Sequence, residues 1–302
     1  MSYEVVVAGG GIAGLTAGLT AARLGRKTLV LAGDVLGGNL LSIEKVEGYP
    51  GFPDGVAGYE LCPMAQAMAA EAGAQFEPAP LARVEGEAPG LRLFTAQEDF
   101  AAKTLIVATG ASPRPLGVPG EERFKGKGVS HCASCDGPLL REAVVAVVGG
   151  GDSAMQESLT LAAFASRVII LCRGTALAGQ ASYRERVLAH PKIEVRFNTQ
   201  VEEIVGDVAV SGVRLRGKPG VVDAAAVFTY IGLDPNTAFL NGRVPLDPHK
   251  RIPTDGTMAS QARGIFAAGL ARAGSPGRAI ASAGEGAAAA EAADRYLRGE
   301  TK

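Results

Sequence analysis

The stretch YEVVVAGGGIAG, residues 3–14, decides the first part of the fold. Its first half, YEVVVA, has the apolar and β-branched composition of a buried strand. Its second half places three glycines, Gly9, Gly11 and Gly14, in G-x-G-x-x-G spacing. Glycines at this spacing permit a tight turn and let a pyrophosphate approach the start of a following helix. The stretch therefore predicts the strand-to-helix turn of a dinucleotide-binding fold.

The chain that follows supplies the rest of a βαβ unit. Residues 15–25, LTAGLTAARLG, have a helical pattern, and residues 27–31, KTLVL, predict the next strand. Asp34 lies a little past the end of this strand, near the position that usually contacts a ribose. Because the glycine motif stands between a predicted strand and a predicted helix, it indicates a dinucleotide site. The alternative is a tight turn that binds no ligand.

The same pattern recurs in the middle of the chain. Residues 143–148, AVVAVV, predict a strand, and Gly149, Gly151 and Ala154 follow in G-x-G-x-x-A spacing. A helical stretch comes next, and residues 167–171, RVIIL, predict the second strand of this unit. The chain therefore contains two dinucleotide folds, about 140 residues apart.

Three further segments complete the prediction of an α/β protein. Residues 104–110, TLIVATG, and 264–269, GIFAAG, are typical of strands that end in glycine, and residues 279–297 have helix-forming composition. The 302 residues are 47% hydrophobic and include 41 glycines, which suits an α/β protein with many tight turns. We predict two Rossmann-like dinucleotide-binding domains.

Charge and hydropathy exclude several classes of function. The formal net charge is −1 and no run of lysine or arginine stands out, which argues against nucleic acid and anionic membranes as partners. The N-terminus enters a strand almost at once, without the basic segment and cleavage site of a signal peptide. No apolar run free of charges reaches the ~18 residues of a membrane span. We therefore expect a cytoplasmic protein.

The stretch SHCASCDG, residues 130–137, contains two cysteines in C-x-x-C spacing, Cys132 and Cys135. Zinc would normally need four ligands, yet Cys62 and Cys172 have no partner nearby in the sequence and the three histidines are far apart. We therefore expect no metal. In a reducing compartment a close pair is more often catalytic than structural, and the two nucleotide folds favour redox use over an inert pair of thiols.

Eight motifs occur in order along the chain: GGGIAG (9–14), GGNL (37–40), VEGYPGF (46–52), ATGAS (108–112), CASCDG (132–137), GGGDSA (149–154), GLDPNT (232–237) and GIFAAG (264–269). With these motifs the chain resembles the low-molecular-weight thioredoxin reductases over nearly its whole length. Each motif alone has little specificity, whereas their order and spacing together are highly specific.

The resemblance implies a discontinuous FAD-binding domain, residues 1–115 and 241–302, with a nicotinamide-type domain inserted at residues 116–240. The crossings fall near GASPRP (110–115) and LDPNTA (233–238), whose Gly, Pro and Asn content suits hinges. Members of this family are homodimers, in which the inserted domain rotates so that either the disulfide or the nicotinamide faces the flavin. The partner that the resemblance implies is thioredoxin or a similar small thiol protein.

Within CASCDG the resemblance assigns three roles. Cys135 matches the thiol that faces the flavin, Cys132 the thiol that attacks the partner disulfide, and Asp136 the acid–base residue that protonates the leaving thiolate. The physical chemistry agrees, because C-x-x-C spacing closes a small ring reversibly and the thiolate is the reactive form. For Asp136, a helix N-cap or a turn aspartate is the alternative.

The same resemblance implies which residues hold the two nucleotides. For FAD they are Gly9, Gly11, Gly14, Gly38, Asn39, Thr109, Gly110, Gly269, Leu270, Arg278 and Ala279. For a nicotinamide nucleotide they are Gly149, Gly151, Ala154 and Arg173.

The nicotinamide site departs from the family at residues 171–180, LCRGTALAGQ. Members usually carry His-Arg-Arg here, with another arginine a few residues later, and these side chains grip the 2′-phosphate of NADPH. Cys172 takes the histidine position, Arg173 remains, and Gly174 and Ala178 replace the other arginines. We therefore expect poor use of NADPH. A plain NADH site is not evident either, because no Asp or Glu ends the strand.

Two arginines leave an alternative open at this site. Arg184 and Arg186, in SYRERV, follow in the next segment and could supply the same fork of hydrogen-bond donors to a 2′-phosphate.

The FAD site departs at Leu270, where the family has an aspartate bound to the ribityl chain. Gly277 and Arg278 replace an Arg-Gln pair before the C-terminal helix, and Gly48 stands where an asparagine is usual. Losing the aspartate removes a charge-assisted hydrogen bond of roughly 1.5–3 kcal/mol. Because the glycine loop, GGNL and ATG persist, we still expect FAD, held less tightly or with a changed potential.

Four functions follow from these observations. The leading one is a flavin-dependent disulfide reductase that acts on thioredoxin, and a close variant takes its electrons from reduced ferredoxin or another donor. The third is a dithiol oxidase that acts on a small molecule, and the fourth is a sensor or scaffold without catalysis. The retained CASCD motif argues against the fourth, because its thiol spacing suits exchange. The first three remain open at this point.

Overall fold

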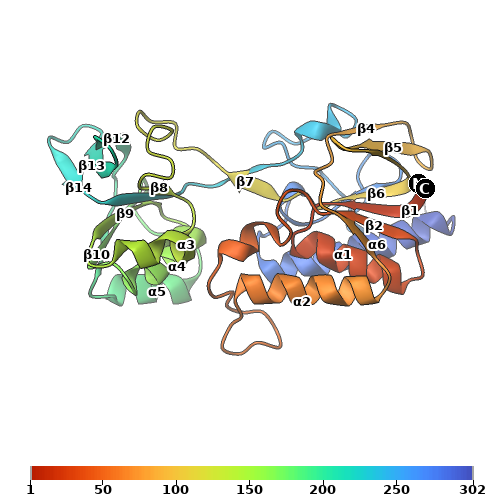
Figure 1. Cartoon of the computed structure of the whole chain (residues 1–302), viewed down its shortest axis with the longest axis horizontal. Helices are drawn as coiled ribbons and strands as arrows, with labels where there is room; N and C mark the ends of the chain where they lie inside the picture. The colour runs from red at the N-terminus through yellow and green to blue at the C-terminus, as the bar shows by residue number, and fades with distance from the viewer. Residues whose placement is uncertain (1, 301–302) are drawn as a thin grey trace. The chain divides into compact units, whose positions relative to one another are not determined.

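The computed structural model describes residues 2–300 and divides the chain into two compact units. Unit 1 comprises Met1–Ser112 and Asp234–Lys302, and unit 2 comprises Pro113–Leu233. Each unit has a sheet built around parallel strands, with helices along one face (Figure 1). The α/β fold with two Rossmann-like units that the sequence predicted is confirmed. Across residues 2–300, no helix is both long and apolar enough to span a bilayer.

A seven-stranded sheet lies at the centre of unit 1 in the described chain. Its strands are β1 (Ser2–Ala8), β2 (Thr28–Leu31), β3 (Gln75–Glu77), β4 (Arg83–Glu85), β5 (Leu91–Phe94), β6 (Asp99–Val107) and β17 (Ile265–Ala267). The order is β3-β2-β1-β6-β5-β4, with β17 also paired to β6. β1 runs parallel to β2 and β6, and Ala8 at its end lies beside Val107. This pairing brings the glycine loop after β1 next to the ATG segment after β6.

Three helices cover one face of this sheet (Figure 1). They are α1 (Ile12–Arg23), α2 (Gly58–Glu71) and α6 (Ala279–Leu297), and short 3-10 turns occur at η1 (Gly38–Ser42), η3 (Ala238–Leu240) and η4 (Gly269–Ala271). α1 and α6 touch backbone to backbone at Gly286, where an added Cβ would collide with the carbonyl oxygen of Ala13. Only a glycine allows this approach, which holds α6 against the start of α1.

Unit 2 repeats the same plan with a five-stranded parallel sheet in the described chain. Its strands are β8 (Val129–Ser130), β9 (Val144–Gly149), β10 (Arg167–Leu171), β11 (Ile193–Arg196) and β15 (Ala226–Tyr230), in the order β11-β10-β9-β15-β8. The helices on one face are α3 (Ala133–Asp136), η2 (Gly137–Leu140), α4 (Asp152–Ala162) and α5 (Ala181–Ala189) (Figure 1). Apolar side chains of β9, β10 and β15 pack against these helices.

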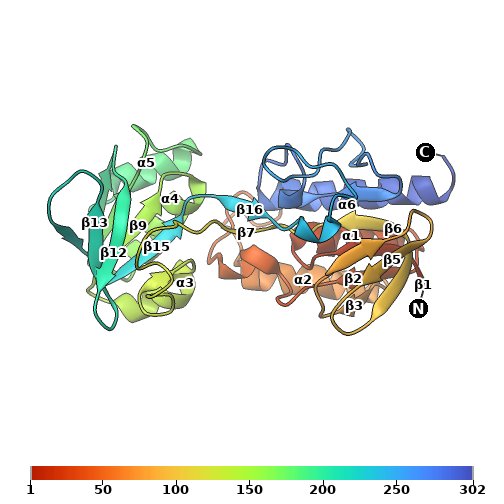
Figure 2. The ribbon, with the colours of Figure 1, turned by 90° about the horizontal axis from the view of Figure 1, so that it is seen from above.

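A second sheet covers the other face of unit 2 (Figure 2). It consists of β12 (Val201–Gly206), β13 (Val210–Leu215) and β14 (Val221–Asp223), which pair antiparallel. Buried residues of this sheet such as Ile204 and Val213 pack with Val148 and Ile169 of the parallel sheet. The parallel sheet is therefore buried on both faces, as parallel sheets usually are.

The chain passes between the units twice, along β7 (Ala111–Pro113) and β16 (Leu233–Pro235). These two strands pair with each other. Backbone hydrogen bonds continue the pairing at both ends, from Asn236 to Gly110 and from Arg114 to Gly232.

Candidate active site

The stretch SHCASCDG lies where β8 ends and α3 begins. Cys132 caps the start of α3 with an extended backbone, and one helical turn brings Cys135 back beside it. The two residues form a disulfide with their Cα atoms 5.3 Å apart, within the usual range for a disulfide. Cys135 is exposed and Cys132 is partly buried. The local turn therefore holds the two sulfur atoms where they can join and separate.

Hydrogen-bond donors surround the sulfur of Cys132. The backbone N–H of Cys135 donates to this Sγ at 3.2 Å, and the hydroxyl oxygen of Ser134 lies 3.5 Å from it. The N–H of Cys132 donates to the hydroxyl of Ser130 at 3.1 Å, which fixes the residue in place. Hydrogen bonds to a charged form stabilise it, so these donors favour a thiolate at Cys132 after reduction. Cys132 is therefore suited to attack a second disulfide.

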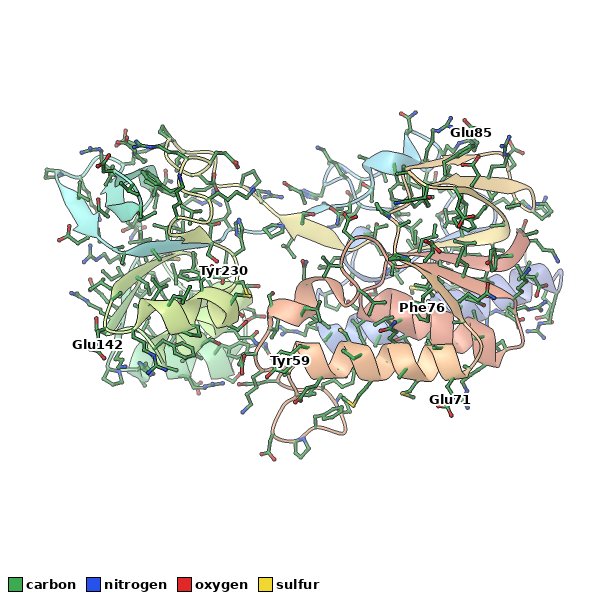
Figure 3. The ribbon with its side chains drawn as sticks, in the orientation of Figure 1. Tyr59, Glu71, Phe76, Glu85, Glu142 and Tyr230 are labelled. Carbon is green, nitrogen blue, oxygen red and sulfur yellow. A yellow bond between two sulfur atoms is a disulfide. The ribbon has the colours of Figure 1, made fainter. Side chains whose placement is uncertain are left out.

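Asp136 ends α3 directly after Cys135, with a partly buried side chain. It precedes η2, but within the described chain its side chain makes no capping hydrogen bond there. Its carboxyl group lies within electrostatic reach of Tyr230. Tyr230, at the end of β15, is labelled in Figure 3. Burial, followed by the charges of Glu157 and Asp136, raises the pKa of Tyr230 far above its usual value. The residue directly after the redox pair thus has an ionisable carboxyl group, within electrostatic reach of a hydroxyl that keeps its proton.

The first glycine loop leaves room for a pyrophosphate at the start of α1. Gly9 has a φ of +115°, and a Cβ there would collide with the carbonyl oxygen of Ala108. A Cβ at Gly14 would collide with the carbonyl oxygen of Gly9, so the turn closes only with glycines. A Cβ at Gly11, by contrast, would meet no atom within 4 Å. This open space beside the helix N-terminus fits the pyrophosphate of FAD.

The GGNL segment lies against the first glycine loop. Gly37 and Gly11 form a parallel β-bridge, and a Cβ at Gly38 would lie 3.6 Å from Cα of Gly11. The side-chain amide of Asn39 donates to the carbonyl oxygen of Ala111 at 2.8 Å. This hydrogen bond ties GGNL to the chain that follows ATG, so the structure brings both segments to the same end of the sheet in unit 1.

The ATG segment is held by Asn236 on the returning chain. The hydroxyl of Thr109 donates to the backbone oxygen of Asn236 at 2.7 Å, and the side-chain amide of Asn236 donates back to the Thr109 oxygen at 3.0 Å. Gly110 has a φ of +67°, and a Cβ there would meet no atom within 4 Å. Gly110 therefore adds to the open space along the end of the sheet.

The C-terminal part of the expected FAD site begins at η4 and ends at α6. Gly269 has a φ of +69° and starts η4, and Arg278 and Ala279 stand at the start of α6. Leu270 packs toward the loop between them, because a Cβ at Gly277 would lie 3.2 Å from its Cδ2 atom. Leu270 and Gly277 both depart from the family pattern. Their contact shows that the Leu270 side chain occupies space that is open because Gly277 has no side chain.

Sequence reasoning missed a buried ion pair beside this turn. Glu285 on α6 accepts a hydrogen bond from the N–H of Gly269 at 2.7 Å and pairs with Arg272 at 2.7 Å. Glu285 is 8% exposed, and its only signal in the sequence is that it is one of two glutamates in an alanine-rich helix. Nearby, the hydroxyl of Ser275 is buried without a hydrogen-bond partner in the described chain. A buried hydroxyl of this kind usually has a partner, and a polar group of a bound FAD would supply one.

The second glycine loop has the same open geometry as the first. Gly149 has a φ of +145°, and a Cβ there would collide with the carbonyl oxygen of Tyr230. A Cβ at Gly151 would meet only the carbonyl oxygen of Ala178, at 3.8 Å. Ala154 is fully buried in α4, where its small side chain lets the helix approach the loop. The start of α4 therefore has room for a second pyrophosphate.

The segment after β10 has little positive charge near this loop. Arg173 is exposed and is the only basic residue among residues 171–180, while Gly174 and Ala178 are exposed and uncharged. Cys172 is buried, with its Sγ 3.6 Å from the carbonyl oxygen of Ala176. The position that is usually histidine thus faces the interior.

The two arginines of the next segment lie on α5. Both Arg184 and Arg186 are exposed, and the Arg186 guanidinium lies 5.7 Å from the ring centroid of Tyr183. Arg186 is therefore already engaged with a side chain of its own helix.

The remaining two cysteines do not belong to the redox pair. Cys62 and Cys172 are buried free thiols, and burial raises the pKa of Cys62 to about 11. Among residues 2–300, no group of three or more His, Cys, Asp or Glu side chains is placed to hold a metal ion.

Known proteins share both the sequence and the fold of this chain. The family described as pyridine nucleotide-disulphide oxidoreductase matches residues 3–286. The thioredoxin reductase of Treponema pallidum is 38% identical over 299 residues, which cover 98% of this chain and 97% of that protein. The thioredoxin reductase of Mycolicibacterium smegmatis is 39% identical over 300 residues, with 98% and 96% covered.

A solved structure agrees with these sequence matches. The crystal structure of Lactococcus lactis thioredoxin reductase, in the conformation called FR, matches this chain with a TM-score of 0.95 and 33% identity. The match covers 98% of this chain and 99% of that one.

Proposed function

This chain belongs to the low-molecular-weight thioredoxin reductase family of pyridine nucleotide-disulphide oxidoreductases, and we propose that it passes electrons from FAD through Cys132 and Cys135 to thioredoxin or a similar thiol protein. As a member of this family it is a flavoprotein disulfide oxidoreductase. The observation that carries the proposal is the disulfide at the start of α3, in which the first sulfur accepts the N–H of Cys135.

We assign FAD to a domain of residues 1–115 and 241–302, which corresponds closely to unit 1 (Met1–Ser112 and Asp234–Lys302). The residues proposed to hold it are Gly9, Gly11, Gly14, Gly38, Asn39, Thr109, Gly110, Gly269, Leu270, Arg278 and Ala279. The open positions at Gly11 and Gly110 and the buried hydroxyl of Ser275 support this assignment. When bound, FAD supplies the electron pair that reduces the disulfide.

The residues of α3 carry out the exchange with the partner. The thiolate of Cys132 attacks one sulfur of the partner disulfide, that S–S bond breaks, and a mixed disulfide forms. Cys135 then attacks Cys132, closes the internal disulfide and releases the second partner sulfur as a thiolate. Asp136 supplies a proton to a leaving thiolate and recovers it in the next turnover. Each cycle oxidises one dithiol and reduces one partner disulfide.

The electron donor is the point where this chain differs from its family. Gly149, Gly151, Ala154 and Arg173 are proposed to hold a nicotinamide nucleotide in the domain of residues 116–240, with low affinity for NADPH. The exposed, uncharged Gly174 and Ala178 favour this proposal and a second candidate, in which reduced ferredoxin or another donor reduces the flavin. A dithiol oxidase that acts on a small molecule is the third possibility. We propose a cytoplasmic homodimer in each case.

An anaerobic titration of the purified holoprotein tests the proposal. NADPH, NADH and reduced ferredoxin are added in separate experiments, and the flavin absorbance is followed until it bleaches. Oxidised thioredoxin is then added to the reduced protein. Reoxidation of the flavin with the appearance of thioredoxin thiols supports a reductase, whereas a reduced protein that only oxygen reoxidises contradicts it.

A further inference from the structure

His131 stands directly before Cys132, at the point where β8 ends. β8 and β15 run parallel, with Ser130 beside Phe228. Continuing this register by one residue places His131 beside Thr229. The strand pairing therefore fixes the backbone of His131, from which the imidazole extends, next to the redox pair.

One ring nitrogen of His131 is held by Thr229. Nδ1 lies 3.0 Å from the carbonyl oxygen and 3.0 Å from the hydroxyl oxygen of Thr229, which is only 1% exposed. A carbonyl oxygen can only accept, so we assign the proton of the neutral ring to Nδ1 and its basic lone pair to Nε2. Within residues 2–300, Nε2 has no hydrogen-bond partner. In enzymes that activate a nucleophile, a second group often orients the general base. Thr229 and His131 have this arrangement, because Thr229 anchors the ring and leaves a basic nitrogen free.

Each cysteine of the pair has an ionisable side chain as its immediate neighbour. His131 precedes Cys132, and Asp136 follows Cys135. Exchange with a partner requires proton transfer at the outer sulfur, because the attacking thiol loses a proton and the partner's leaving thiolate gains one. Histidine is the side chain that exchanges protons most readily near neutral pH.

We propose that His131 exchanges the proton of Cys132 during attack on the partner disulfide, an inference that rests on the proposed function. Nε2 takes the proton of the Cys132 thiol, and the resulting thiolate attacks one sulfur of the partner. The partner S–S bond breaks, and its leaving thiolate takes the proton from the imidazolium. Cys135 then displaces the second partner sulfur, with Asp136 as the proton source. One dithiol is oxidised, one disulfide is reduced, and two protons move from the first to the second.

The elements around His131 carry few other titratable groups. They are Asp136 on α3, Tyr230 on β15, and Asp152 and Glu157 on α4. Tyr230 keeps its proton across the pH range of interest, because burial raises its pKa. The other three are carboxyl groups. A step of thiol reactivity between about pH 5 and 8 is assigned to His131 where neutral variants of this residue remove it.

Alkylation of Cys132 tests this assignment without any partner or electron donor. The FAD-loaded Cys135→Ser variant keeps Cys132 as a free thiol, and its reaction with iodoacetamide is followed by mass spectrometry across this pH range. We expect His131→Asn in the same background to react about 10- to 100-fold more slowly at pH 7 and to lose the step near the histidine range. Asparagine can still donate to the Thr229 carbonyl, so it retains the anchor but not the base.

His190→Asn, at the partly buried residue that caps the end of α5, is the control and should keep the parent profile. His131→Gln provides a second neutral variant if His131→Asn yields too little folded protein. An unchanged pH profile in the neutral variants would overturn the proposal, and so would a uniform loss of rate without a change in the profile's shape. Because no thioredoxin is present, these outcomes are independent of whether the proposed reductase reaction occurs.

Discussion

Glu285 and Gly269 are joined by a hydrogen bond of 2.7 Å from the Gly269 N–H to the buried carboxylate. The same carboxylate pairs with Arg272, and the two side chains are 9% and 15% exposed. Because Gly269 begins η4 and Glu285 lies on α6, this one side chain ties together the two segments that complete the proposed FAD site. The carboxylate thus supports the turn at which the family's ribityl-binding aspartate is replaced by Leu270.

Glu285→Ala should destabilise unit 1 and weaken FAD binding. It leaves the partly buried Arg272 without its carboxylate partner, and removing one partner of a buried ion pair typically costs about 3–5 kcal/mol of unfolding free energy. Urea unfolding and the flavin content after gel filtration measure the two effects. Glu291→Ala, at an exposed position of the same helix, is the control and should behave as the parent protein. Equal stability of the two variants would show that the ion pair does not support the turn.

Single serine variants of the redox pair should differ in colour. Cys132→Ser keeps Cys135, the thiol assigned to face the flavin, and should show a long-wavelength charge-transfer band between thiolate and flavin. Cys135→Ser should lack this band, and both variants should lose disulfide reduction entirely. Absorbance spectra at high pH, where the thiolate predominates, provide the measurement. A band in Cys135→Ser alone would reverse the assignment of the two thiols.

Cys62 should lower the stability of the fold at alkaline pH. Burial raises the pKa of its thiol from 9.0 to about 11, so the folded state keeps the proton at pH values where the unfolded state has lost it. A group whose pKa is higher in the folded state than in the unfolded state contributes its full stabilisation below the unfolded-state pKa. That contribution is lost as the pH rises through the folded-state pKa. A pKa difference of about two units between the folded and unfolded states corresponds to about 3 kcal/mol of unfolding free energy.

Cys62→Ala removes this contribution. Its unfolding free energy should therefore fall less steeply than that of the parent protein between about pH 8.5 and 11. Urea unfolding at several pH values compares the two slopes. Parallel curves would mean that the thiol ionises equally easily in the folded and unfolded states.

Much of the fold was predictable because regular patterns repeat over many residues. The strand at 167–171 and the helix at 279–297 have the bounds that the sequence indicated. β12 to β14 were not predicted, since short strands of mixed polarity such as Val221–Asp223 lack a distinctive period. Their burial depends on contacts with distant strands, which local sequence does not encode.

The candidate active site also has parts that the sequence predicted and parts that it did not. The spacing of Cys132 and Cys135 placed them together, because a C-x-x-C turn is local. The contact between Leu270 and Gly277, the ion pair of Glu285 and the anchor of His131 all depend on packing between separate segments. Those relationships had no local signal and needed the folded chain.

The nucleotide preference of unit 2 depends on whether residues 171–180 can hold a 2′-phosphate. A 2′-phosphate is normally met by fork-shaped arginine contacts, and each hydrogen bond to a charged group contributes roughly 1.5–3 kcal/mol. Two such contacts correspond to roughly 3–6 kcal/mol, on the order of 10²- to 10⁴-fold in affinity. Gly174 and Ala178 are exposed, and a Cβ at Gly174 would meet only Ala176, at 3.6 Å or more. Both positions can therefore accept an arginine without a collision.

The double variant Gly174→Arg/Ala178→Arg should gain affinity for NADPH but not for NADH, which lacks the 2′-phosphate. Anaerobic stopped-flow reduction of the flavin over a range of nucleotide concentrations gives both apparent dissociation constants. Arg184→Ala tests the alternative that the next helix already supplies the contact, and it should leave the parent's weak response to NADPH unchanged. If the parent protein is reduced rapidly and completely at low micromolar NADPH, and Arg184→Ala abolishes this reduction, then the phosphate is gripped from α5 and our interpretation of LCRGTALAGQ is wrong.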